Sequence, residues 1–235
     1  MNRYYDRDFT GFHLETLRLV TNKYVKNKKV LDIGCGGGWC EKIYLKRGVR
    51  KMVGIDTSKT ALKLARNIKN RAITFKFGSA ISIPFKKNTF DTIVSWEVLE
   101  HIPRGTERKM FAEAFRVLKP GGYFFLSTQH NNPLSTVLDP AWWLMGHRHY
   151  SERQLRTFAT GAGFSIKRLY LKGKIYIVLY ALDLYISKWI FRREIFFEKF
   201  ILEKTEKEYL EETGFHSIIL KCQKPDVNQT GTVSE

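Results

Sequence analysis

One stretch of the sequence joins a short apolar run, an acidic residue and a dense group of glycines. It reads VLDIGCGGGWC over residues 30–40, and a helical pattern follows it. Glycine has no Cβ, so such a turn allows positive φ and close approach of a ligand, while the next helix offers N–H groups at its start. Asp56 ends a second apolar run about 20 residues later, where a carboxylate can accept two ribose hydroxyls. These residue types at this spacing predict a site for a nucleotide-like ligand.

Asp32 narrows the chemistry of that ligand. It comes just before the glycines and gives the pattern DxGxGxG, whereas a dinucleotide site normally reads GxGxxG. A carboxylate there would oppose a pyrophosphate, but it can engage an ammonium group directly or through water. A ligand with a ribose, an adenine and an amino-acid end therefore fits the turn better than a dinucleotide.

Strand patterns alternate with helical patterns around this turn. The alternation predicts an α/β fold, a Rossmann-like doubly wound sheet of about seven strands, mostly parallel. Loops after the strands then form the functional edge of the sheet. Strands are predicted at residues 30–33, 52–55, 73–77, 90–95, 123–128, 164–171 and 216–222. Helices are predicted at residues 12–26, 38–47, 59–69, 106–118 and 151–161, with a stop and turn at 119–122.

The segment before the last predicted strand has a composition of its own. Aromatic and basic residues are interleaved over residues 175–202. We predict a helical insertion at about residues 173–214, within a single domain of residues 1–224 followed by a disordered tail at 225–235. The insertion suits a core or dimer helix pair, or an element at a membrane interface.

The bulk composition limits the cellular setting and the partners. The chain has 235 residues and a net charge of +17, which suits a solvated basic surface, an anionic membrane surface or a nucleic acid. Its three cysteines form no CxxC pair, and we find no secretory signal and no membrane-spanning apolar run. We therefore expect a cytoplasmic protein. Peripheral contact with the inner face of the membrane is a further expectation. The sequence does not indicate an oligomeric state.

Five motifs in order resemble class I S-adenosylmethionine-dependent methyltransferases, in the group that acts on small molecules and quinones. They are VLDIGCGGGW, GID, FKFGSAISIPF, NTFDTIVSWEVLEHIP and FRVLKPGGYFFLST. The resemblance implies S-adenosylmethionine as cofactor. It also implies which residues contact each part of the cofactor. Asp32, Gly34, Gly36 and Gly38 would contact the methionine part, and Asp56 the ribose. Thr57, Ser79 and Ala80 would contact the adenine, and Ser95 and Trp96 would lie beside the sulfonium.

Methyl transfer needs in-line alignment, and an oxygen nucleophile also needs its proton removed. Glu97, Glu100 and His101 follow the fourth predicted strand, and on a helix they would share a face. The string EVLEH is similar to ubiquinone-pathway O-methyltransferases. We predict Glu97 and His101 as catalytic residues, with His101 as a base or a substrate contact. A merely structural loop is one alternative, and a cluster holding a divalent cation is a lesser one, with no metal ligand assigned. His149 is the third catalytic candidate, although its neighbourhood could instead dock the helix at 151–161.

The predicted function is methyl transfer from S-adenosylmethionine to a small-molecule or lipid-like acceptor, such as a quinone or prenylated compound. Oxygen is slightly preferred over carbon as the acceptor atom. One alternative is an RNA methyltransferase of the wobble-uridine type, but the fourth strand ends SWEV, not with the (D/N/S)PP(Y/F) box, and we do not expect a nucleic-acid partner. The other is a non-catalytic protein that binds the cofactor.

Overall fold

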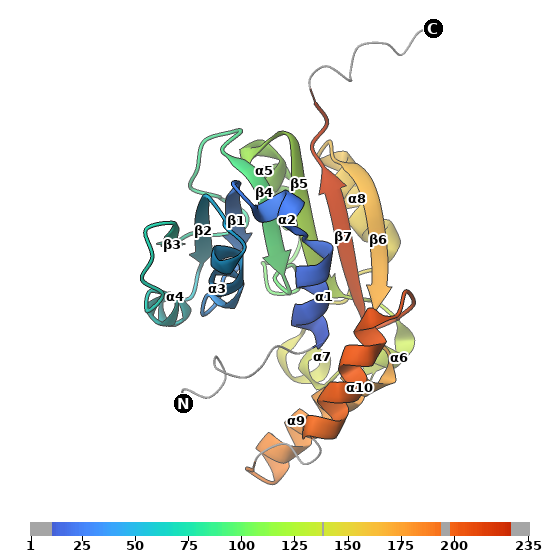
Figure 1. Ribbon diagram of the computed structural model, residues 1–235. Coiled ribbons are helices and arrows are strands. Elements are labelled where there is room, and N and C mark those ends of the chain that lie inside the picture. The colour runs from blue at the N-terminus through green and yellow to red at the C-terminus, as the bar shows by residue number, and fades with distance from the viewer. Residues whose placement is uncertain (1–10, 138, 194–197, 227–235) are drawn as a thin grey trace, which may run out of the picture. The chain divides into compact units, whose positions relative to one another are not determined.

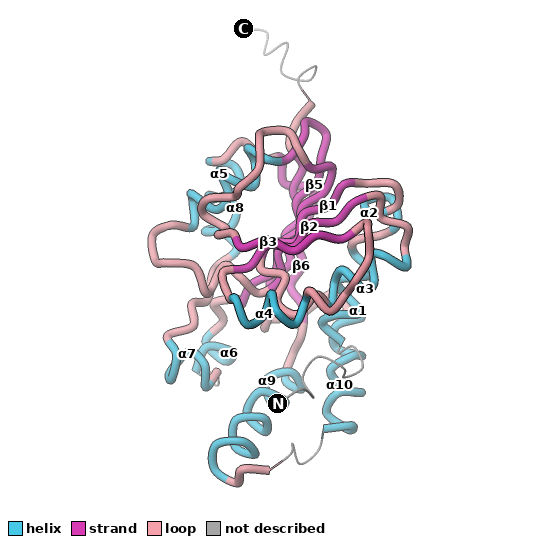
Figure 2. The backbone as a smooth tube through the Cα atoms, turned by 90° about the vertical axis from the view of Figure 1, so that its left-hand side faces the viewer, coloured by secondary structure: helices cyan, strands magenta, loops and turns pink. Residues whose placement is uncertain are grey.

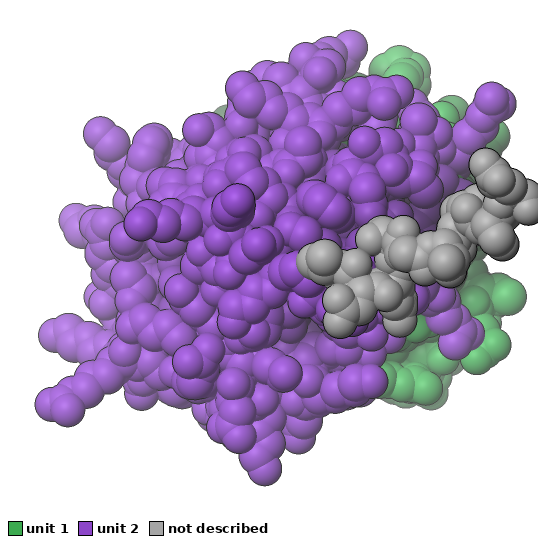
Figure 3. Space-filling model, turned by 90° about the horizontal axis from the view of Figure 1, so that it is seen from above, with its two compact units in different colours: residues 1–19, 128–152, 169–219 green, residues 20–127, 153–168, 220–235 purple. Residues whose placement is uncertain are grey.

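The computed structural model describes residues 11–137, 139–193 and 198–226 (Figure 1). The chain divides into two compact units, which are described separately (Figure 3). Unit 1 holds residues 1–19, 128–152 and 169–219, and unit 2 holds residues 20–127, 153–168 and 220–235. The single domain at 1–224 stays a prediction. The predicted tail lies outside the described residues from residue 227 onward.

A seven-stranded sheet has the order β3-β2-β1-β4-β5-β7-β6, and the pairs from β3 to β5 are parallel. This confirms the predicted doubly wound α/β fold. Strand order reverses beside β1, between β2 and β4, and ligands of such sheets bind at this point. The strands are β1 (Lys29–Ile33), β2 (Lys51–Asp56), β3 (Ile73–Phe77), β4 (Phe90–Trp96), β5 (Leu118–Gln129), β6 (Ser165–Lys172) and β7 (Ser217–Gln223).

The central strands of unit 2 are buried on both faces, which explains their near-continuous apolar runs. Figure 2 shows α3 on one side of these strands and α5 and α8 on the other. Helix α5 buries its apolar stripe, including Met110, Phe111 and Ala114. The helices of this unit are α2 (Asn22–Val25), α3 (Trp39–Lys46), α4 (Lys59–Ala65), α5 (Glu107–Val117) and α8 (Glu152–Gly161).

Several helix and strand ends are shifted from the sequence prediction, such as that of α4, which ends at Ala65 and not at residue 69. Two differences change an element. The helix predicted at 12–26 divides into α1 (Gly11–Leu19) and α2, because Thr21 between them has an extended backbone. The predicted turn at 119–122 lies inside β5. Leu118 pairs with Phe90 and Tyr123 with Thr92, so the four residues between Leu118 and Tyr123 face a single residue of β4 as a bulge.

Unit 1 contains α1 and most of the remaining helices. Helix α10 packs against α1 and α9. None of the helices in the described ranges is long and apolar enough to cross a membrane. The segment between β6 and β7 is helical where the structure describes it. The further helices are α6 (Pro133–Val137), α7 (Pro140–Met145), α9 (Ile175–Tyr185), the π-helix η1 (Ile186–Ile190) and α10 (Glu198–Leu210).

A buried ion pair ties the ends of unit 1 together. Lys172 Nζ lies 2.9 Å from Glu15 Oε1, and both side chains are almost fully buried. The same ammonium donates to the carbonyl oxygens of Tyr209 (3.1 Å) and Glu211 (2.6 Å). The three contacts replace the water that this cation loses on burial, and they join α1, β6 and the end of α10.

We expect Lys172→Met to destabilise the protein by about 3–5 kcal/mol, because it removes the buried cation of the Glu15 carboxylate. Only the exposed Arg18, whose Nη1 lies 3.8 Å from Glu15 Oε2, then stays near this carboxylate among the described ion pairs. The matched control is Lys207→Met, which breaks a surface pair whose side chains are 64% and 65% exposed. Its cost should stay below about 1 kcal/mol. Denaturant unfolding measures both, and equal costs would contradict the role of Lys172.

Candidate functional site

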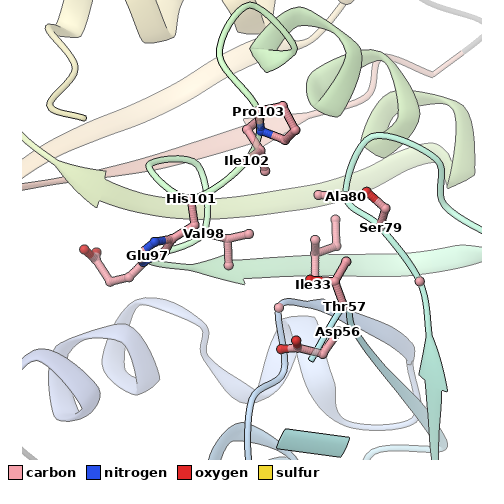
Figure 4. A pocket seen from close by; sticks show the side chains of 12 residues that line it. Ile33, Asp56, Thr57, Ser79, Ala80, Glu97, Val98, His101, Ile102 and Pro103 are labelled. Carbon is pink, nitrogen blue, oxygen red and sulfur yellow. The ribbon is translucent and has the colours of Figure 1, made fainter. Parts of the chain in front are cut away.

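A cavity of about 300 Å³ opens in unit 2 at the carboxyl ends of β1 to β4. Figure 4 shows the Asp56 and Ser79 side of this cavity facing the segment that follows β4. Parallel strands bring these ends to one edge of the sheet, so residues far apart in the chain meet there. Seven predicted site residues line it: Gly34, Asp56, Thr57, Ser79, Ala80, Glu97 and His101.

The glycine turn after β1 lies close to Val98 in the segment that follows β4. Gly34 has φ +75°, and a Cβ there would overlap the Cγ2 atom of Val98. Gly36 also has positive φ (+52°), but a Cβ on it would meet no atom within 4 Å. The N–H groups of Gly34 and Cys35 both donate to the carbonyl of Ile55, at 2.8 and 3.0 Å. The turn is therefore fixed against the end of β2.

Asp56 connects this turn to the helix after β2. Its Oδ2 accepts from the Gly36 N–H at 2.9 Å, and its Oδ1 accepts from the Ser58 N–H at 2.7 Å. A carboxylate has about four acceptor positions, so two are left after these bonds. Asp56 also lines the cavity. It can therefore hold the turn and accept ligand hydroxyls at the same time.

The other predicted cofactor residues are not among those that line the cavity. Asp32 is buried in the sheet, and burial, the carboxyl of Glu41 and that of Asp56 raise its pKa, in that order of size. Ser95 and Trp96 are buried at the end of β4. Gly36 and Gly38 shape the turn, both with positive φ. Their contacts to a cofactor stay predictions.

The segment after β4 is a series of turns, so the expectation that Glu97, Glu100 and His101 share a helical face is wrong. Glu97 has φ +52°, a left-handed conformation that interrupts any helix. Its Oε1 accepts from Ser127 Oγ at 2.6 Å, and Ser127 Oγ accepts from the Glu97 N–H at 3.1 Å. Glu97 and His101 still meet at one end of the cavity (Figure 4).

Metal ligands do not gather at this site. Across the ranges that the structure describes, no group of three His, Cys, Asp or Glu residues is arranged to hold an ion. We propose no metal site.

His149 belongs to unit 1 and is held by hydrogen bonds on both ring nitrogens. Its Nε2 lies 2.9 Å from Asp139 Oδ2, its Nδ1 lies 3.0 Å from Thr136 Oγ1, and its side chain is 2% exposed. Asp139 also accepts from the Ala141 N–H at the start of α7. Burial alone would raise the pKa of Asp139, but hydrogen bonds from His147 and His149 outweigh it and hold the pKa below its usual value. The catalytic role of His149 stays a prediction.

Sequence reasoning missed the apolar part of the cavity wall. These residues lie in turns and at strand ends, where neither helical nor strand periodicity applies. The signal available was their position next to the glycine turn and within the EVLEHIP motif. They are Ile33, Gly78, Val98, Ile102 and Pro103.

We expect Gly34→Ala to destabilise unit 2 more than Gly36→Ala. Both variants force alanine into positive φ, at about 1–2 kcal/mol each, but only Gly34→Ala also drives a Cβ into Val98. Thermal unfolding measures the difference. If Gly36→Ala lowers the melting temperature as much as Gly34→Ala or more, the close approach at Gly34 does not constrain the turn.

Part of the chain is similar to known methyltransferases. Residues 31–126 match the family described as a methyltransferase domain. A ubiquinone biosynthesis O-methyltransferase of Pseudomonas fluorescens (strain Pf0-1) is 36% identical over 114 residues, 45% of this chain and 46% of that protein. Its counterpart in Thiobacillus denitrificans is 34% identical over 122 residues, 50% and 51% of the two chains. This chain spans about half the length of the curated relatives it matches.

Solved structures share the fold over most of the chain. An S-adenosylmethionine-dependent methyltransferase from Mesorhizobium loti has a TM-score of 0.63 at 17% identity, covering 88% of this chain and 95% of that one. The [4+2]-cyclase SpnF has a TM-score of 0.64 at 19% identity, covering 95% and 86%. Residues 31–126 therefore match the family described as a methyltransferase domain, and the chain shares its fold with the solved S-adenosylmethionine-dependent methyltransferase.

Proposed function

We propose that this protein transfers a methyl group from S-adenosylmethionine to a small hydrophobic or lipid-like acceptor. The observation that carries the proposal is the cavity at the strand-order reversal, where the turns after β1 to β4 converge. It joins a carboxylate with spare acceptor positions, Asp56, to a solvent-exposed imidazole, His101. A cofactor site and an acid–base group thus share one cavity.

The residues present fit the cofactor. Asp56 keeps acceptor positions for the two ribose hydroxyls, beside Thr57. Ser79 and Ala80 offer a polar and an apolar contact for the adenine edge. Asp32 and the glycines then face the cationic methionine part, because Asp32 lies near the end of β1, separated by Ile33 alone from the turn that begins at Gly34.

Once bound, the cofactor supplies a methyl group on an activated sulfonium, so little covalent help is needed. His101 is exposed on the cavity wall and in its neutral form can take the proton of an acceptor hydroxyl. Glu97 lies at the same end, and its hydrogen bond with Ser127 fixes the side chain against β5. We assign His101 as the base and Glu97 as a group that contacts the acceptor.

One observation favours a lipid-like acceptor with a reactive oxygen. The relatives named ubiquinone biosynthesis O-methyltransferases match about half of this chain. A quinone or another prenylated phenol combines a reactive oxygen with a hydrophobic chain.

Transfer of tritiated methyl to a cell extract, separated into lipid, small-molecule, RNA and protein fractions, tests this function. We expect label in the lipid or small-molecule fraction. His101→Gln should lower kcat by about 10²-fold or more without weakening cofactor binding, because it removes only the base. Asp56→Ala should weaken cofactor binding itself.

The same assay has two internal controls. His149→Gln tests the remaining base candidate, and if His149 is structural this variant lowers the melting temperature but leaves the kcat of the folded fraction. Label confined to RNA would support the wobble-uridine alternative, and binding without any transfer would support a non-catalytic protein. Unchanged kcat in His101→Gln would contradict its role.

We also propose that α9, η1 and α10 contact an anionic membrane surface at the inner face of the membrane. The exposed apolar side chains on these helices include Ile190 (69% exposed) and Phe200 (56%), and Phe191 (57%) directly follows η1. Cations lie among them, such as Lys188 on η1, and Lys204 is 5.5 Å from the ring centre of Phe200. Apolar insertion and attraction to anionic headgroups then act together.

Co-sedimentation with anionic phospholipid vesicles at low salt tests this contact. We expect the protein to pellet with the vesicles, and Ile190→Glu to remain mostly in the supernatant because a carboxylate would enter the interface. Phe77→Glu is the matched control, since Phe77 is a similarly exposed residue (59%) on β3 of unit 2. The proposal would be overturned if the wild-type protein stayed in the supernatant, or if both variants lost vesicle binding equally.

A further inference from the structure

A buried carboxyl lies close to the glycine turn, and neither the fold nor the proposed reaction uses it. Glu41 is in the first turn of α3 and has no exposed surface. Within the described ranges, neither of its side-chain oxygens has a hydrogen-bond partner. Burying an ionised carboxylate in this way is costly, so the group is either neutral or awaits a cation.

Backbone register places Glu41 beside Asp32. Asp32 of β1 pairs with Gly54 of β2, and paired residues of neighbouring strands project on the same face of the sheet. A Cβ at Gly54 would overlap Glu41 Oε1 and lie 2.8 Å from Cys35 Sγ. The Glu41 carboxyl therefore occupies the space that a side chain at position 54 would fill, on the face to which Asp32 points.

Apart from the guanidinium of Arg47 beside the end of α3, the groups described around this pair are acidic or neutral. Besides burial and Glu41, the negative charge of Asp56 on β2 raises the pKa of Asp32. Cys40 and Tyr44 on α3 are fully buried. Burial is the main cause that raises the pKa of both Cys40 and Tyr44, so they stay uncharged.

Three further groups complete the surroundings. The pKa of Cys35 in the turn is also raised by burial, and Trp96 on β4 has a buried indole N–H. Arg47 ends α3, where its guanidinium donates to the Val20 carbonyl at 2.8 Å. With these groups around it, burial raises the pKa of Glu41 to about 8.

We propose that Asp32 and Glu41 form a coupled acid pair that holds a proton in the cofactor-free protein and releases it when the cationic amino-acid end of S-adenosylmethionine binds. The inference rests on the proposed function. A positive charge near a carboxyl favours its ionised form, so the ammonium group replaces the proton as counter-charge. The O–H bond of the acid breaks, and the proton passes to solvent.

Titration calorimetry at pH 7 in buffers of different ionisation enthalpy measures the protons released on binding. We expect close to one proton per S-adenosylmethionine bound to wild-type protein, and at least a two-fold smaller release in Glu41→Gln. 5′-Methylthioadenosine lacks the amino-acid end and should bind without release. Glu203→Gln, a surface variant on α10, should behave as wild type.

The outcomes separate this inference from the function on which it rests. Binding with the same heat in every buffer overturns the acid pair and leaves the proposed function intact. Full proton release in Glu41→Gln also overturns it. Failure of S-adenosylmethionine to bind overturns both.

The stability of the free protein gives a second readout that needs no ligand. A carboxyl whose pKa is raised in the folded state stabilises the protein at low pH, and this contribution is lost as pH rises through the folded pKa. The melting temperature of wild-type protein should therefore fall between about pH 5 and 9 more steeply than that of Glu41→Gln. Asp32→Asn serves as the second variant if Glu41→Gln does not fold, and parallel profiles would contradict the pair.

Discussion

The hydrogen bond from the Gly36 N–H to Asp56 is the constraint on which the rest of the site depends. At 2.9 Å it joins the turn after β1 to the end of β2. The turn has positive φ at Gly34, Gly36 and Gly38, a conformation that an unsupported chain would leave readily. Because Asp56 uses one oxygen for Gly36 and the other for Ser58, its remaining acceptor positions are held in a fixed orientation in the cavity. One carboxylate thus shapes the loop and keeps acceptor positions directed into the cavity.

Charge is divided between the site and the rest of the protein. The chain carries a net charge of +17, yet Asp32, Glu41 and Asp56 lie at or near the glycine turn. Acidic groups in a low-dielectric setting favour a cationic ligand, and S-adenosylmethionine carries both a sulfonium and an ammonium. Cations such as the exposed Lys188 and the half-buried Lys204 favour an anionic partner instead. The two signs therefore suit two different partners, a soluble cofactor and a charged surface.

Sequence reasoning reached the fold and the strand-end turns because those depend on local pattern. Apolar runs ended by glycine or acid mark the strands, and parallel pairing then brings Gly34, Asp56 and Ser79 to one edge. What it missed depends on contacts between distant residues. Glu97 leaves the helical conformation and bonds to Ser127 on β5, 30 residues later. Glu41 is buried in the space left by Gly54, which no helical periodicity of α3 reveals.

A crystal structure of the protein with S-adenosylhomocysteine, the unreactive product of the cofactor, would show directly where the cofactor binds. We expect both ribose hydroxyls within hydrogen-bond distance of Asp56, the adenine beside Ser79 and Ala80, and the amino-acid end toward Asp32. Ligand bound elsewhere in the molecule, or no ligand at saturating concentration, would contradict this placement.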